Sequence, residues 1–105
     1  MDAVQKWNME LRAQEIVDIL KEHKFDAHYA ENVENAKKIM QGLIPEGAKI
    51  AVGGSVTLGS TGILDEVIRS PKYQFIDRYA AKDYEEMLNL YREGLTSDVF
   101  VSSVN

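Results

Sequence analysis

The stretch that decides the fold is KIAVGGSVTL, residues 49–58. Its first four residues form a short apolar run, which is typical of a strand buried in a parallel sheet. Two glycines follow, and glycine lets the backbone turn sharply and approach a ligand closely. Ser55 or Thr57 can then cap a helix that begins after the glycines. The stretch therefore predicts a strand, a tight loop and a helix N-terminus in direct succession.

The rest of the chain repeats this alternation on both sides. Apolar residues recur at helical spacing over 4–20, 33–43, 58–68 and 84–95, and strand patterns occupy 25–29, 49–52, 73–76 and 99–101. Local signals mark the helix starts: Asp2 with Gln5 and Asp83 with Glu86 form capping boxes, and Asn32 can cap the second helix. This order predicts a single α/β domain over residues 1–105, with a parallel sheet of about four strands and helices on both faces.

Composition excludes several classes of protein. The chain has 105 residues with 12 basic and 17 acidic side chains, and this net charge of −5 argues against non-specific nucleic-acid binding. No run approaches the roughly 18 apolar residues of a membrane helix, and charges at helical spacing in the first twenty residues argue against a signal peptide. The sequence has no cysteine, which removes disulfides, thiolate nucleophiles and iron–sulfur ligation. We expect a soluble, cytoplasmic protein that binds neither membrane nor nucleic acid.

The residues most able to bind a ligand follow the predicted strands. Ligands of open α/β sheets bind beyond the carboxyl ends of the strands. The candidate ligand-binding residues at this edge are Gly53, Gly54, Ser55, Thr57, Asp77, Arg78 and Asn105, with Ser102 and Ser103 beside them.

The glycine loop suits an anion. Two glycines, two hydroxyls and the N–H groups of a helix N-terminus together favour a phosphate or a carboxylate. The glycine spacing is not that of a dinucleotide fingerprint, and the loop has no P-loop lysine. An ordinary tight turn, with Ser55 or Thr57 as an N-cap, explains the same residues.

Asp77-Arg78 also allows two interpretations. The arginine could bind a planar acid while the neighbouring carboxylate orients it, or the two could form a solvated pair at a strand end. His23 and His28 lie on different predicted elements, so we expect no metal site and no cofactor. No histidine is evidently placed to activate a serine, so no catalytic residue is predicted. Trp7 belongs to an apolar stripe that suits either core packing or a subunit interface.

Several segments together resemble the LUD domain family of lactate-utilisation proteins. They are Lys6-Trp7, Phe25-Asp26-Ala27, residues 43–47, residues 52–58, Gly62-Ile63-Leu64-Asp65, Asp77-Arg78 and residues 98–105. The resemblance implies a three-layer, Rossmann-like fold similar to ribose-phosphate isomerases, glucosamine-phosphate deaminases and CoA transferases, in which the corresponding loop holds a phosphate or contacts CoA. Family members often have acidic residues where this chain has Gly59-Ser60-Thr61.

Family sequences usually continue beyond position 105, so the chain resembles roughly the first half of the family's domain, either as a truncated fragment or as a natural short form. We expect it to complete its sheet by homodimerisation, since an open sheet edge favours pairing with another chain.

The resemblance implies an accessory subunit in the oxidation of L-lactate to pyruvate, with iron–sulfur partner subunits. Two alternatives remain open. One is an isomerase or CoA-transferase-like enzyme that uses Ser55 and Thr57 to hold the phosphate of a small molecule, with Asp77 or Arg78 near the reacting carbon. The other is a non-catalytic assembly module that makes its contacts through the Trp7 helix.

Overall fold

A computed structural model describes residues 2–104 of the chain. The chain divides into two compact units, residues 1–39 and 40–105. The first contains α1 (Ala3–Glu22) and the first part of α2 (Val33–Leu43), and the second contains the sheet and the remaining helices. That residues 1–105 form one domain stays a prediction.

Helix α1 begins as its sequence predicts. The Asp2 carboxylate accepts a hydrogen bond from the Gln5 backbone N–H at 2.8 Å, and the Gln5 side-chain oxygen accepts one from the Asp2 N–H at 3.3 Å. The helix ends before Lys24, whose positive φ of 68° breaks the helical path. The predicted apolar stripe is largely not buried, because Trp7 is 61% exposed and the single buried residue of α1 is Val17.

The predicted strand at 25–29 is absent. These residues are irregular, and the Phe25 N–H bonds back to the Leu20 carbonyl at the end of α1. Alternation of apolar and polar side chains cannot make a strand without a neighbouring strand to pair with. Helix α2 follows as predicted, and the Asn32 side chain accepts from the Asn35 N–H at 2.9 Å.

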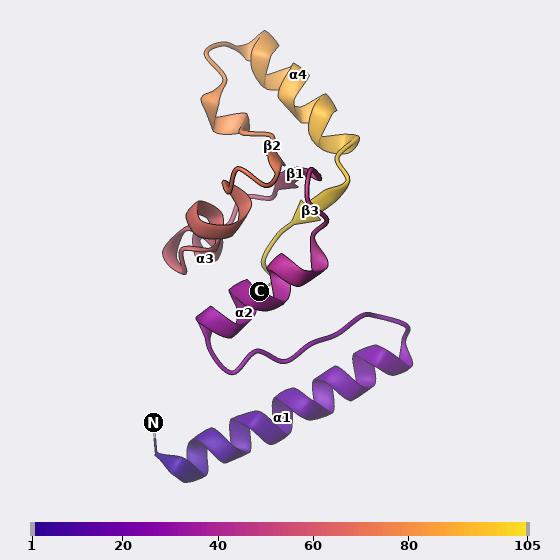
Figure 1. Ribbon diagram of the computed structural model, residues 1–105, viewed down its shortest axis with the longest axis vertical. Coiled ribbons are helices and arrows are strands. Elements are labelled where there is room, and N and C mark those ends of the chain that lie inside the picture. The colour runs from indigo at the N-terminus through magenta and orange to yellow at the C-terminus, as the bar shows by residue number, and fades with distance from the viewer. Residues whose placement is uncertain (1, 105) are drawn as a thin grey trace. The chain divides into compact units, whose positions relative to one another are not determined.

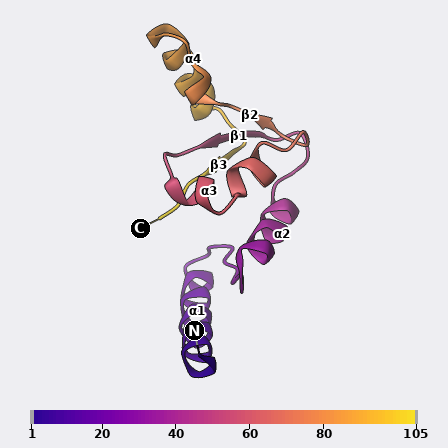
Figure 2. The same ribbon diagram turned by 90° about the vertical axis from the view of Figure 1, so that its left-hand side faces the viewer.

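The second unit is built on a parallel sheet of three strands rather than four. Its strands are β1 (Lys49–Val52), β2 (Gln74–Phe75) and β3 (Val99–Val101), in the order β2-β1-β3. Lys49 pairs with Gln74, and Ile50 pairs with Phe75 on one side and Val99 on the other. Helix α3 (Val56–Ser60) and α4 (Tyr84–Leu95) lie on opposite faces of this sheet (Figures 1 and 2). The relation to the isomerase fold stays a prediction.

The helix predicted after the glycine loop is broken into two short pieces. Helix α3 ends at Ser60, and a π-helical turn, η1, covers Leu64–Ile68. Gly62 lies between them with φ of +78°, a left-handed conformation that glycine adopts without strain and that stops an α-helix.

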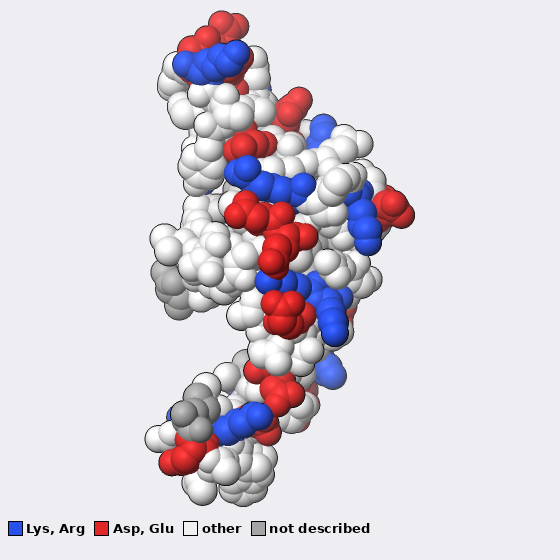
Figure 3. Space-filling model, turned by 60° about the vertical axis from the view of Figure 1, so that its left-hand side comes forward, with Lys and Arg blue, Asp and Glu red and all other residues white. Residues whose placement is uncertain are grey.

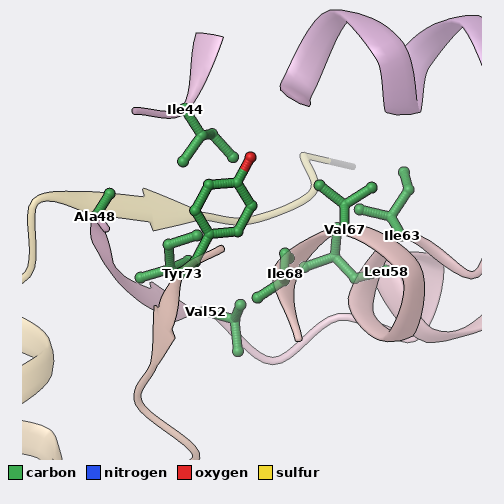
Figure 4. Packing of buried hydrophobic residues seen from close by; sticks show 9 residues of the cluster. Ile44, Ala48, Val52, Leu58, Ile63, Val67, Ile68 and Tyr73 are labelled. Atoms are coloured by element: carbon green, nitrogen blue, oxygen red, sulfur yellow. The ribbon is translucent and has the colours of Figure 1, made fainter. Parts of the chain in front are cut away.

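The core of the second unit lies on the α3 side of the sheet. Ile50, Val67 and Ile68 are completely buried. Figure 4 shows side chains of the two helical pieces converging with Val52, Tyr73 and Ile44, the residue that follows α2 (the cluster comprises Ile44, Ala48, Ile50, Val52, Leu58, Ile63, Val67, Ile68 and Tyr73).

Helix α4 begins at the predicted cap. The Asp83 carboxylate accepts from the Glu86 N–H at 2.8 Å, while the Glu86 carboxylate accepts from the Lys82 N–H rather than from the Asp83 N–H. The apolar spacing over residues 84–95 suggests that Tyr84, Tyr91 and Leu95 face inward, but all three are exposed. None of the helices in the described part of the chain combines the length and apolar composition needed to cross a bilayer.

Candidate functional site

The carboxyl ends of β1 and β3 lie side by side. The Gly53 N–H donates to the Val101 carbonyl at 2.9 Å, and the Ser55 and Ser103 hydroxyl oxygens are 2.7 Å apart. Two residues 48 positions apart in the sequence are thus hydrogen-bonded at the edge where the sequence predicts a ligand. Asn105, the remaining candidate in this segment, lies outside the described residues.

The two loop glycines are sites of close approach. A Cβ on Gly53 would lie 3.2 Å from the Ser102 Cβ, and a Cβ on Gly54 would lie 3.1 Å from the Arg78 Nη2 atom. The Ser102 Cβ is attached directly to the backbone, whereas the Arg78 Nη2 atom is the far end of a flexible side chain. The absence of a side chain at Gly54 therefore lets the guanidinium of Arg78 reach the loop.

Ser55 acts as a helix cap as well as a partner of Ser103. Its hydroxyl accepts from the Leu58 N–H at 3.2 Å, which is the ordinary N-cap role considered for it above. Thr57 is exposed in the first turn of α3, and its carbonyl accepts from the Thr61 hydroxyl at 2.6 Å. Because α3 has only five residues, few peptide dipoles align along it. Any anion bound at this loop would therefore depend on side chains more than on a helix dipole.

Arg78 supplies the positive charge of the site. It begins a short 3-10 helix, η2 (Arg78–Ala80), whose cap is the Asp77 carboxylate bonded to the Tyr79 N–H at 3.0 Å. The Arg78 guanidinium donates to the Tyr79 hydroxyl at 3.0 Å and lies over the rings of Tyr79 and Tyr91, 5.0 and 5.8 Å from their centroids. The hydrogen bond to Tyr79 raises the pKa of Arg78, burial lowers it, and Tyr91 adds to the rise. Because an arginine is not deprotonated in a protein, Arg78 is a permanent cation.

Neither interpretation of Asp77-Arg78 describes Asp77, which faces Arg69 instead of Arg78. Its second carboxylate oxygen lies 3.5 Å from the Arg69 guanidinium, which also approaches Asp65 at 3.6 Å and lies over the Phe75 ring. Adjacent residues at a strand end point in different directions, so the carboxylate faces the helical turn η1 while the guanidinium of Arg78 faces the loop and α4. Two tyrosines, not a carboxylate, hold Arg78.

A cavity of about 260 Å³ lies next to Arg78, between β1 and the C-terminal part of α4. Its walls include Ala51, Leu90, Tyr91 and Phe100, and Arg78 is the single charged residue among those that line it. Sequence reasoning missed both tyrosines and this cavity. The sequence places Tyr91 at helical spacing from Met87, but this spacing indicates only that the two residues share a face of the helix.

Metal ligands and charged patches are the remaining features of the described residues that could contribute to a site. The described residues contain no group of three or more His, Asp or Glu placed to hold a metal ion. Acidic and basic side chains are interspersed on the face shown in Figure 3 rather than gathered into a patch of one sign.

The model of the LUD domain family matches residues 13–105. The chain belongs to the LUD domain family. No curated protein and no solved structure matches it significantly. All the candidate ligand-binding residues lie within the matched part of this LUD domain, whereas Trp7 and the first turns of α1 precede it.

Proposed function

We propose that this LUD domain binds a small carboxylate or phosphorylated anion at the carboxyl edge of its sheet. We further propose that it acts as an accessory subunit in the oxidation of L-lactate to pyruvate. The observation that carries the proposal is the approach of Arg78 to Gly54, where a Cβ would lie 3.1 Å from the guanidinium. The segments that follow the three strands thereby bring the Arg78 guanidinium, the glycine backbone at residues 53–54 and the Ser55 and Ser103 hydroxyls to one edge of the sheet.

The chemistry of these groups suits an anion. A guanidinium carries five N–H donors in a planar fork that matches a carboxylate, which is more than its two tyrosine neighbours engage. The Ser55 and Ser103 hydroxyls can donate to the same ligand. Arg78 keeps its charge throughout the physiological pH range, as every arginine does in a protein. The site can therefore bind and orient a small acid.

The accessory role follows from what the oxidation requires. Conversion of a 2-hydroxy acid to a 2-oxo acid removes two electrons and two protons, and the electrons need an acceptor. The sequence has no cysteine to ligate an iron–sulfur cluster. We therefore assign ligand binding to this chain and electron acceptance to iron–sulfur partner subunits.

The alternative enzyme, an isomerase or CoA-transferase-like protein, would use the same edge for the phosphate of its substrate. The paired hydroxyls of Ser55 and Ser103 favour it, since hydroxyls are common phosphate donors. The two candidates differ in the ligand that binds, so a binding panel separates them.

Calorimetric titration with L-lactate, pyruvate, phosphate and ribose 5-phosphate tests ligand binding. We expect Arg78→Gln to weaken the ligand that binds by about 10- to 100-fold, because a hydrogen bond to a charged group contributes about 1.5–3 kcal/mol. Arg92→Gln removes the same charge from the exposed side of α4 and is the matched control. Equal losses in both variants, or no binding by the parent chain, would refute the anion site.

Reconstitution tests the accessory role. The chain is mixed with iron–sulfur subunits of a lactate-oxidising system, and reduction of their clusters by L-lactate is followed by absorbance. We expect reduction to depend on this chain and to fall with Arg78→Gln but not with Arg92→Gln. Cluster reduction at the same rate without the chain would contradict the role.

Homodimerisation is a separate proposal. Among the described residues β3 pairs with β1 alone, so its outer edge has unpaired backbone groups that a second copy can bind. Light scattering coupled to size-exclusion chromatography measures the mass directly. A monomer across the micromolar range would contradict the proposal.

A further inference from the structure

The cavity beside Arg78 has one charged side chain and otherwise apolar walls. The Ala51 side chain lies on the face of β1 that is turned toward α4, where a Cβ on Gly94 would come within 3.5 Å of it. Leu90, Tyr91 and Phe100 continue the apolar lining, and Arg78 is the one charged residue of that lining. This arrangement differs from the core on the other face of the sheet, where buried apolar residues form one cluster without a charged member.

The dimensions of the cavity limit what can fill it. Its volume of about 260 Å³ corresponds to about nine water molecules at roughly 30 Å³ each. It is small compared with typical ligand pockets of about 300–1,000 Å³. A compact molecule of roughly ten non-hydrogen atoms matches this space, and lactate alone would leave most of it empty.

The charge of the cavity also selects its ligand. A single guanidinium neutralises one negative charge, and its planar fork fits a carboxylate. A phosphate dianion would keep a second charge next to apolar walls, which is unfavourable. The nearby cation Arg69 already pairs with Asp65 and Asp77. The site therefore favours a monoanion.

Two exposed apolar side chains mark the rim. Leu95 is 88% exposed and Phe100 is 63% exposed, and both line the cavity. An apolar group inside the cavity would remove part of both side chains from water. The binding energy of such a ligand would come from this burial as well as from Arg78.

We propose that the cavity is the binding site of a monocarboxylate that carries an apolar group of about four to eight carbons. Its carboxylate pairs with Arg78, and its apolar group lies between Ala51 and the rings of Tyr91 and Phe100. The inference rests on the proposed function, because both use Arg78 as the anion anchor. It adds a preference for larger, apolar side chains over lactate itself.

Calorimetry on the full chain tests this with acetate, butanoate, hexanoate and 3-phenylpropanoate, and with the neutral 3-phenylpropanamide. We expect the affinity to rise about fourfold for each added methylene, so that hexanoate binds about fifteenfold more tightly than butanoate. The amide should bind at least tenfold more weakly than its acid, since it lacks the charge that Arg78 recognises.

Two variants identify the apolar wall. Phe100→Ala and Leu95→Ala each remove an exposed rim side chain, so folding should survive both. We expect each to reduce the ratio of hexanoate to acetate affinity by about threefold or more. Tyr84→Ala, which removes an exposed aromatic residue of α4 outside the cavity lining, should leave that ratio unchanged.

The outcomes separate the two proposals. A flat affinity series, with lactate or phosphate still dependent on Arg78, overturns the apolar site and leaves the proposed function intact. Hexanoate affinity that is unchanged in Arg78→Gln overturns the carboxylate anchor, and lactate or phosphate binding that still depends on Arg78 then leaves the proposed function intact. Equal reduction of the hexanoate-to-acetate ratio by Tyr84→Ala and Phe100→Ala overturns the placement of the apolar group.

Discussion

The two loop glycines provide a matched pair of substitutions, one expected to affect stability and the other ligand binding. In Gly53→Ala the new Cβ meets the Ser102 Cβ at 3.2 Å, and this neighbour is fixed to the backbone at the end of β3. In Gly54→Ala it meets the Arg78 Nη2 atom at 3.1 Å, which can move aside by a few tenths of an ångström. Neither glycine has the positive φ that would strain an alanine. We therefore expect Gly53→Ala to destabilise the fold and Gly54→Ala to weaken ligand binding.

The magnitudes follow from general costs. Overpacking lowers the free energy of unfolding by about 1–3 kcal/mol. Replacement of glycine by alanine raises it by about 0.4–1 kcal/mol, because alanine reduces the conformational entropy of the unfolded chain. Gly53→Ala should then lose about 1–2 kcal/mol. With an unfolding entropy of about 2.1 cal/mol/K per residue, a chain of 105 residues loses about 5–9 °C in Tm. Gly54→Ala should keep its Tm within about 2 °C, since the guanidinium yields and the chain entropy favours alanine.

Thermal unfolding by circular dichroism measures the first effect, and calorimetric titration with the ligand that binds measures the second. We expect Gly54→Ala to bind about five- to tenfold more weakly, because the displaced guanidinium loses part of its hydrogen-bond geometry. If Gly54→Ala lowers Tm as much as Gly53→Ala does, or binds ligand as tightly as the parent chain, the assignment of Arg78 to the glycine loop is wrong.

Three further substitutions test other parts of the structure. Ser55→Asp should abolish anion binding through charge repulsion. It should leave Tm nearly unchanged, because aspartate can still accept a hydrogen bond from the Leu58 N–H. Anion binding retained in a calorimetric titration would show that the loop is not part of the site. Ile68→Ala should lower the free energy of unfolding by about 2–5 kcal/mol, measured with denaturant, because Ile68 is completely buried. The control Ile19→Ala changes a side chain that is 54% exposed and should lower it far less. Similar losses in the two variants would contradict the described core. Asp2→Ala should reduce the stability of α1 by about 1 kcal/mol, seen as faster hydrogen exchange confined to its first turns, and unchanged exchange there would mean that the cap contributes nothing.

The sequence predicts the parts of this fold that depend on neighbours within a few residues. The caps at Asp2, Asn32 and Asp83 are correct because each hydrogen bond joins residues three positions apart. The strands at 49–52 and 99–101 are correct because apolar runs of that length favour a buried sheet. LUD family membership is also confirmed, since it follows from motifs spread over most of the chain.

Two of the failures concern contacts between distant residues, and a third concerns a local backbone conformation. The alternation at 25–29 looked like a strand, but a strand also needs a partner that the sequence does not specify. The break at Gly62 depends on a positive φ, whereas the apolar spacing from Leu58 to Ile68 suggested one continuous helix. Nothing in the sequence indicated that Asp77 would face Arg69, because adjacent charges suggest a pair while side-chain directions depend on packing.

The strand order also determines when the candidate site forms during folding. In the pair Lys49 and Gln74 the separation is 74 − 49 = 25 residues, and in the pair Ile50 and Val99 it is 99 − 50 = 49 residues. Closing the longer loop costs about 0.6 kcal/mol more, so we infer that β1 joins β2 before it joins β3. In pulsed hydrogen exchange the Ile76 amide, which bonds Ile50, should be protected before the Gly53 amide, which bonds Val101, and the reverse order would contradict the inference. Ligand-binding competence is then a late folding event, because Ser103 reaches Ser55 only when the second closure is complete.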